Sequence, residues 1–176
     1  MVEDEDLMNI LAQINHWIDN CDTKSSILLA LIGIITGVIF SNKYHCKLIS
    51  LYFNSPNPLS FEFLTYSHLL AGSIILILIG IYHLILSINP NFKINKENVN
   101  SLIFYASIAE NSSEEYKNKI KDDDYSLTED IISQIHINAE ICTKKFKNYQ
   151  CGLMTSIFGF ILLSILIIAR YTIYTI

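Results

Sequence analysis

The stretch that decides the fold spans residues 63–88, FLTYSHLLAGSIILILIGIYHLILSI, which are 26 consecutive residues without an Asp, Glu, Lys or Arg. As an α-helix rising ~1.5 Å per residue, it exceeds the thickness of a bilayer's hydrocarbon core, ~30 Å. Uncharged runs also cover residues 25–40 and 152–169, and charged residues bracket every run. We therefore predict an all-α membrane protein with three transmembrane helices.

Two other interpretations of the first run fail on its composition. A secretory signal peptide begins with basic residues, whereas the acidic residues 3–6 precede this run. A helix buried in a soluble core would keep a polar face, but residues 27–35 are apolar around the whole circumference apart from Gly33. The first run is therefore expected to lie in lipid.

Basic residues set the expected orientation. Of the 12 Lys and Arg residues, eight lie between the second and third runs, so the positive-inside rule places that segment and the N-terminus in the cytoplasm. The predicted order is a cytosolic amphipathic helix at 1–24, transmembrane helices at 25–42, 63–88 and 151–170, an external loop at 43–62, a cytosolic helical region at 89–150 and an external tail at 171–176.

Helical periodicity continues outside the apolar runs. The N-terminal stripe predicts one helix from about residue 6 to about residue 40, and a second stripe leads into the third run. We expect the stripes to pack together, although an interfacial helix with Trp17 at headgroup depth is an alternative for the first. The stripes are Leu7, Ile10, Leu11, Ile14, Trp17, Ile18 and Cys21, and Leu127, Ile131, Ile135, Ala139, Cys142, Phe146 and Tyr149.

Local motifs between residues 101 and 130 predict further structure. Ser112 with Glu115, and Ser126 with Glu129, have the S-x-x-E pattern of capping boxes, so a helix should begin after each serine. Residues 102–105 are rich in β-favouring side chains, which suggests an extended segment.

Several classes of function are excluded by composition. The net charge of −5 and the presence of a single Arg argue against nucleic-acid binding. All six glycines lie in or at the start of the apolar runs, so no Gly-rich phosphate loop is available. Five histidines and four cysteines lack HExxH or CxxC spacing, so we expect no metal site, no cofactor and no intrachain disulfide. The chain is interpreted as a non-enzyme.

Small residues recur at helical spacing within two runs. Gly33 and Gly37 form a GxxxG pair, and Thr155 and Gly159 repeat the small-xxx-small pattern. Such residues let helix backbones approach closely in lipid. They predict either packing within one bundle or self-association into a homo-oligomer, and the sequence leaves both open.

Short motifs in a fixed order resemble one known family. They are Asp22-Thr23-Lys24 at the first run, Phe104-Tyr105-Ala106-Ser107-Ile108-Ala109 followed by Ser113-Glu114-Glu115-Tyr116, and Gln134-Ile135-His136 followed by Lys145-Phe146. Their order and spacing, from Trp17 to Ile168, resemble the transmembrane effectors of bacterial Pycsar anti-phage systems.

That resemblance implies a two-gene defence system. A partner cyclase senses phage and makes cUMP or cCMP, which activates the effector, and the effector damages the inner membrane so that the cell dies or stops growing. Some effectors of this kind carry a separate cyclic-nucleotide-binding domain. This sequence departs from them, because it has neither a phosphate-binding cassette nor a cytosolic Arg.

Two sets of residues are candidates for sensing the nucleotide. Helix N-termini at Ser112 and Ser126 offer backbone N–H groups to a phosphate. Asp22, Lys24, Gln134 and Lys145 lie on the two long helices and are predicted to form a polar clasp, which is either a static network or a switch. The rival functions are a membrane scaffold or anchor subunit and a constitutive holin-like pore.

Overall fold

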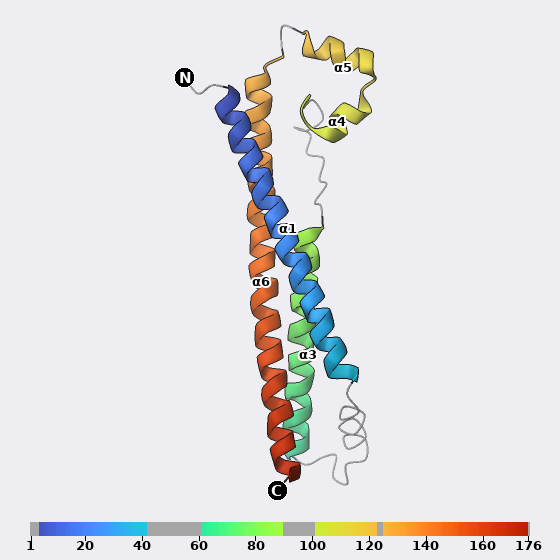
Figure 1. Ribbon diagram of the computed structural model, residues 1–176, viewed down its shortest axis with the longest axis vertical. Helices are drawn as coiled ribbons and strands as arrows, with labels where there is room; N and C mark the ends of the chain where they lie inside the picture. Colours follow the sequence, from blue (N-terminus) through green and yellow to red (C-terminus); the bar gives the residue numbers. More distant parts are fainter. Residues whose placement is uncertain (1–3, 42–60, 90–100, 123–124, 176) are drawn as a thin grey trace. The chain divides into compact units, whose positions relative to one another are not determined.

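The computed structural model describes residues 4–41, 61–89, 101–122 and 125–175 (Figure 1). Within these ranges the chain forms helices α1 (Asp4–Ser41), α3 (Phe61–Ile88), α4 (Tyr105–Glu110), α5 (Ser113–Ile120) and α6 (Leu127–Thr175). No strand occurs in the same ranges. The prediction of an all-α protein is therefore confirmed, whereas the predicted external loop lies almost entirely outside the described residues.

The two longest helices run without interruption through both amphipathic and apolar sequence. Helix α1 has 38 residues and α6 has 49, so they measure ~57 Å and ~74 Å and each exceeds the thickness of a bilayer core. Acidic side chains occupy the first turn of each helix, where they interact favourably with the helix dipole. The predicted continuity of both amphipathic segments with their apolar runs is confirmed.

Three helices are long and apolar enough to cross a membrane. They cover Asp4–Ile39, Leu64–Ile88 and Leu127–Ala169. Large apolar side chains such as Ile34, Leu78 and Phe158 remain exposed in the isolated chain. In lipid this exposure carries no penalty, and it agrees with the prediction of three transmembrane helices.

The chain divides into two compact units. Met1–Cys21 and Asn89–Phe146 form the first, which we call the polar unit, and Asp22–Ile88 with Lys147–Ile176 form the second, which we call the membrane unit. Helices α1 and α6 each contribute to both units, α3 belongs to the membrane unit, and α4 and α5 belong to the polar unit.

The segment before α5 differs from its predicted conformation. Residues 102–104 form bends rather than a strand, and Tyr105 already begins the short helix α4. Phe104 keeps extended dihedral angles, with φ −84° and ψ 123°, but no neighbouring strand is available within the described residues to pair with it. The β propensity of this stretch was therefore overridden by its tertiary contacts.

The core of the membrane unit lies where α3 meets the apolar half of α6. Buried positions on α3 recur with alternating spacings of four and three residues, which is the seam expected for a left-handed helical bundle. Ile77 and Leu84 pack with Ile32 of α1, and partly buried side chains of all three helices surround them. The buried α3 positions are Ser73, Ile77, Gly80, Leu84 and Ser87.

Candidate functional site

In the polar unit, α1 and α6 are joined by polar contacts. Thr128 Oγ1 donates to Asp4 Oδ1 at 2.7 Å, and Asn138 Nδ2 donates to Asn15 Oδ1 at 2.9 Å. The two residues of the first pair are 124 positions apart in sequence, and those of the second pair are 123 apart. Because this offset stays nearly constant along both helices, α1 and α6 run parallel in this unit. These contacts join polar residues that are not members of the predicted apolar stripes.

Burial divides the N-terminal stripe into two groups. Ile14 and Cys21 are buried, whereas Ile10 and Trp17 remain exposed, with Trp17 at 47%. On α6, Ile131 and Cys142 are buried in the same unit. Packing accounts for the buried members, and an interfacial position for the Trp17 side chain stays a prediction.

Two polar side chains of α6 are buried among these apolar residues. Gln134 is 4% exposed and Lys145 is 6% exposed. Burial raises the pKa of the Cys142 thiol, the neighbouring Cys21 adds to that rise, and the positive charge of Lys145 opposes it. Lys145 is therefore a buried basic residue of the polar unit.

The residues of the predicted clasp fall in both units. Gln134 and Lys145 belong to the polar unit, and Asp22 and Lys24 belong to the membrane unit. Asp22 is partly buried and Lys24 is exposed. Asp22, Gln134 and Lys145 all take part in interactions within the protein. A direct clasp between the two pairs stays a prediction.

A network of hydrogen bonds attaches the segment before α4 to the start of α6. Asp130 Oδ2 accepts from the Leu102 backbone N–H at 2.8 Å and from the Tyr125 hydroxyl at 3.0 Å, and the Tyr116 hydroxyl donates to Leu102 O at 2.8 Å. Burial and the hydrogen bond to Asp130 raise the pKa of Tyr125 to about 12. Tyr125 therefore remains a hydrogen-bond donor at physiological pH.

Acidic residues lie in the first turn of both helices whose N-termini were predicted to offer N–H groups to a phosphate. At α5 the Ser112 hydroxyl accepts from Glu115 N, and Glu115 Oε2 accepts from Ser112 N at 2.9 Å, which completes the predicted capping box. These hydrogen bonds lower the pKa of Glu115. At α6 Ser126 Oγ accepts from Glu129 N at 3.4 Å, and Asp130 lies in the same first turn. Negative charge at both positions opposes phosphate binding.

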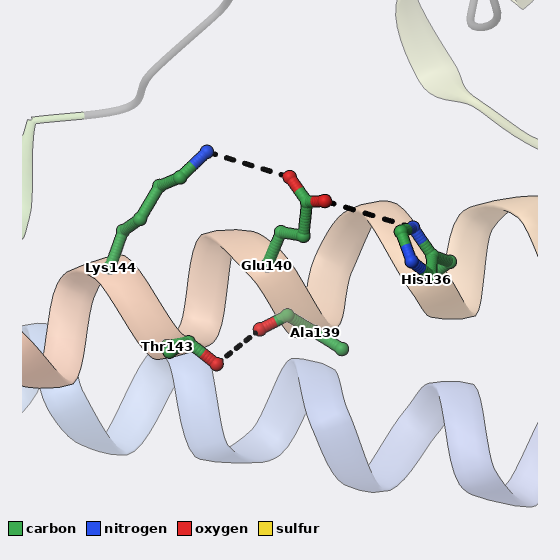
Figure 2. A network of polar contacts seen from close by, with 5 residues as sticks. All are labelled: His136, Ala139, Glu140, Thr143 and Lys144. Atoms are coloured by element: carbon green, nitrogen blue, oxygen red, sulfur yellow. Dashed lines mark hydrogen bonds and ion pairs between the residues drawn. The ribbon is translucent and has the colours of Figure 1, made fainter.

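One face of α6 in the polar unit carries an exposed row of charges (Figure 2). Glu140 lies between His136 and Lys144: its Oε1 is 3.9 Å from His136 Nδ1, and its Oε2 is 3.5 Å from Lys144 Nζ. Separately, the Thr143 hydroxyl donates to Ala139 O, one turn earlier, at 2.9 Å. Each ion pair joins residues four apart and is solvent-exposed, so it adds little stability. This row is best interpreted as a solvated helix face.

In the membrane unit, small residues bring α3 and α6 close together. A Cβ built on Gly80 would clash with Ser156 Oγ and would lie 3.0 Å from Gly152 O. A Cβ on Gly159 would lie 3.0 Å from Ile77 N and 3.1 Å from Ser73 O. Because these contacts include backbone atoms, larger residues at Gly80 or Gly159 would force the helices apart.

The other predicted helix-packing residues lie elsewhere. A Cβ on Gly33 or Gly37 would meet nothing within 4 Å. Thr155 is partly buried and donates to Cys151 O of its own helix at 2.7 Å. Gly159 is thus the member of the predicted set that contacts α3, and self-association through Gly33 and Gly37 stays a prediction.

Polar side chains also join the helices of the membrane unit directly. The hydroxyls of Ser25 on α1 and Ser87 on α3 are 3.0 Å apart. His83 Nδ1 of α3 lies 3.3 Å from Asn148 Oδ1 of α6, and because an amide oxygen only accepts, His83 is the donor. These two contacts link α3 to both of its neighbours.

Two comparisons with known proteins identify the family of this chain. Residues 6–171 match the family described as the Pycsar effector protein domain. The chain belongs to this family. A relative, the Pycsar effector protein GmPycTM of Gulbenkiania mobilis, is 31% identical over 180 residues, which cover 91% of this chain and 90% of the relative. No solved structure matches this Pycsar effector.

The family match tests the resemblance to Pycsar effectors that the sequence motifs predicted. Because it begins at residue 6 and ends at residue 171, it covers nearly all of the three apolar helices and of the polar unit of this Pycsar effector. The resemblance to Pycsar effectors is therefore confirmed. In the described parts of the chain, no group of three or more His, Cys, Asp or Glu residues is placed to hold a metal ion.

Sequence reasoning missed two features of this Pycsar effector. One is the Asp130 network, because a carboxylate in a first helical turn is ordinarily a dipole partner rather than an anchor for a distant segment. The other is the set of buried serines in the membrane unit, Ser25, Ser73, Ser87 and Ser156. The seven-residue spacing of Ser73, Gly80 and Ser87 is the signal that could have found part of it.

We expect Asp130→Ala to detach the segment before α4 from α6 of the Pycsar effector. The Leu102 N–H, in a residue that is 4% exposed, loses its acceptor, and an unsatisfied buried donor costs ~1–3 kcal/mol. Hydrogen exchange at Leu102 measures the change. The neighbouring Glu129→Ala is the control, because the exposed Glu129 side chain leaves that hydrogen bond intact. Unchanged protection at Leu102 in Asp130→Ala would contradict the assignment.

Proposed function

We propose that this Pycsar effector is the membrane-disrupting component of an abortive-infection system. A partner cyclase makes cUMP or cCMP during phage infection, and the effector then impairs the integrity of the inner membrane, so that the cell dies or stops growing. Family membership together with three helices long enough to cross a membrane carries this proposal. The protein acts as a non-enzyme, and its partners are membrane lipid and the cyclic nucleotide.

The continuity of two helices supports control of the membrane unit by the polar unit. Helices α1 and α6 each contribute residues to both units without a break. A ligand that binds more tightly to one arrangement of these helices in the polar unit shifts the population of that arrangement. The same shift then extends into the apolar halves of both helices.

We propose that the polar unit controls the membrane unit through the residues of the predicted clasp. Asp22 and Lys24 lie on α1 where the polar unit ends, and Gln134 and Lys145 are buried polar residues of α6. Burying a charged or amide side chain costs free energy unless hydrogen-bond partners or opposite charges compensate it. A ligand that changes those partners therefore changes which packing of the helices is most stable. In this proposal the clasp is the gating element, and the nucleotide acts on it from the cytosolic side.

We also propose an orientation of the protein in the membrane and its assembly into a homo-oligomer. The concentration of basic residues between the second and third apolar helices favours a cytoplasmic N-terminus. Gly33 and Gly37 present a small-residue surface with nothing within 4 Å of an added Cβ, which favours association with a second copy in the membrane. The active form is then a homo-oligomer.

The direct test uses purified protein in liposomes loaded with a fluorescent dye and an ion indicator. We expect leakage on addition of cUMP or cCMP, but not on addition of cAMP or cGMP. Leakage without any nucleotide would favour the holin-like pore. Absence of leakage with all four nucleotides would reject direct gating and favour the scaffold or anchor function.

A further inference from the structure

The membrane unit buries four serines, which is an unusual set for the interior of an apolar bundle. Ser25, Ser73 and Ser87 are 0% exposed and Ser156 is 2% exposed. Polar groups within transmembrane segments generally face the bundle interior, where they contact other helices or line water-filled cavities. The four hydroxyls therefore require an explanation beyond the small size of serine.

Most hydroxyls of the apolar helices are satisfied within their own helix. Ser164 Oγ donates to Phe160 O at 2.8 Å, and Ser73 Oγ donates to Leu70 O at 2.8 Å. Such bonds to a preceding turn are the ordinary solution for serine in a membrane helix. Ser25 and Ser87 instead hydrogen-bond to each other across α1 and α3.

Ser156 is the exception. Its Oγ is buried and has no hydrogen-bond partner in the described part of the chain. It points toward α3, because a Cβ added to Gly80 would clash with it. A buried hydroxyl without a partner is less favourable than a methyl group of the same size, so close packing alone would be served better by alanine.

The four buried serines lie at the contacts of α3 with its two neighbours, and we call them the hydroxyl seam: Ser25, Ser73, Ser87 and Ser156. Ser25 and Ser87 meet between α1 and α3, and Ser156 faces α3 from α6. On α3, Ser73, Gly80 and Ser87 are seven residues apart and therefore share one face, and Ser156 of α6 lies opposite Gly80. From Ser73 to Ser87 the seam extends ~21 Å along α3, which is most of a ~30 Å hydrocarbon core.

We propose that the hydroxyl seam lines the path of water and small ions when the membrane unit opens. This proposal rests on the membrane-disrupting function proposed above, and it names the residues that line the path. In the closed bundle the glycine contacts hold α3 and α6 together and keep the seam dry. When the helices separate, water supplies the partner that the Ser156 hydroxyl lacks, and the four hydroxyls replace part of an ion's hydration shell.

The test compares Ser156 with Ser164, an exposed serine of the same helix whose hydroxyl bonds to its own backbone. The unsubstituted chain, Ser156→Ala and Ser164→Ala are reconstituted in liposomes, and ion flux is measured after addition of cUMP or cCMP. We expect Ser156→Ala to lower flux about two- to tenfold, the factor that corresponds to one net hydrogen bond. Ser164→Ala should match the unsubstituted chain.

A second comparison separates a lining role from a purely structural one. Ser156→Cys and Ser164→Cys are treated, after activation, with a negatively charged, water-soluble methanethiosulfonate reagent that cannot cross lipid. We expect the reagent to block flux only through Ser156→Cys. The unsubstituted chain, with its native cysteines, gives the baseline, and circular dichroism verifies that each variant is folded.

The outcomes distinguish this proposal from the function on which it rests. If the unsubstituted chain produces no ion flux with any nucleotide, the membrane-disrupting function and the seam both fail. If that chain conducts, but Ser156→Ala conducts equally and the reagent has no effect on Ser156→Cys, the seam alone is overturned. Reagent block of Ser156→Cys, without block of Ser164→Cys, supports the seam even if one alanine variant folds poorly.

Discussion

Gly80→Leu is expected to separate α3 from α6 and to abolish a folded membrane unit. A Cβ at this position already clashes with Ser156 Oγ and lies 3.0 Å from backbone atoms of Gly152 and Ser156. Overpacking of this kind costs ~1–3 kcal/mol when side chains can yield, and more when backbone must move. The protein is solubilised in detergent and unfolded with SDS, and the unfolding is monitored by circular dichroism. A lower unfolding midpoint measures the loss of stability.

Gly72→Leu is the matched control, because it lies on the same helix and nothing is within 4 Å of an added Cβ. We expect its unfolding midpoint to equal that of the unsubstituted chain. Gly33→Leu should also preserve the fold of the single chain for the same reason. Equal destabilisation by Gly80→Leu and Gly72→Leu would show that the α3–α6 contact is not the tight interface described here.

Lys145→Ala is expected to give the second large effect. Lys145 is 6% exposed and interacts within the protein, so we expect its truncation to remove that interaction and to leave a gap in a buried part of the polar unit. Loss of one member of a fully buried ionic or charged hydrogen-bonded pair costs ~3–5 kcal/mol. We expect a lower unfolding midpoint and loss of toxicity when the variant is expressed together with a cyclase that makes the activating nucleotide.

Two lysines serve as controls for Lys145. Lys144 is the adjacent residue and forms an exposed pair with Glu140. Lys119 lies on the last turn of α5, where its exposed side chain donates to Asn111 Oδ1 at 2.7 Å. Removing either side chain should change stability by less than ~1 kcal/mol, as for other surface ion pairs. If Lys144→Ala or Lys119→Ala were as damaging as Lys145→Ala, the buried position of Lys145 would have no special role.

Periodicity and helix-capping chemistry predicted most of the fold. The 3,4-spaced stripe before residue 25 gave the continuity of α1, and the S-x-x-E motif gave the start of α5 at Ser113. These signals are local, so a sequence reveals them directly. Helix α4 was not predicted, because its start at Tyr105 depends on contacts such as the one between Leu102 and Asp130.

The packing of helices against each other was harder to predict than the helices themselves. A GxxxG search examines one helix at a time, and it selected Gly33 and Gly37, which face open space in the single chain. The contact between Gly80 and Gly152 joins two helices that are distant in sequence. Neither residue belongs to a GxxxG pair, and the small-xxx-small pair of Gly152 and Ser156 was not singled out. Ser25 and Ser156 were missed for the same reason, because they lie on other helices than Ser73 and Ser87, whose seven-residue spacing is the only part of the set visible in the sequence.

Helices α1 and α6 contain no proline, and each is unbroken through both units. A continuous hydrogen-bond ladder resists torsion, and sharp bends need proline, a bulge or an inserted group. The sequence of each helix therefore provides no proline at which it would kink between the two units. Under the function proposed above, a ligand-induced change in the packing of α6 in the polar unit meets no proline along α6 before the sequence of the membrane unit begins.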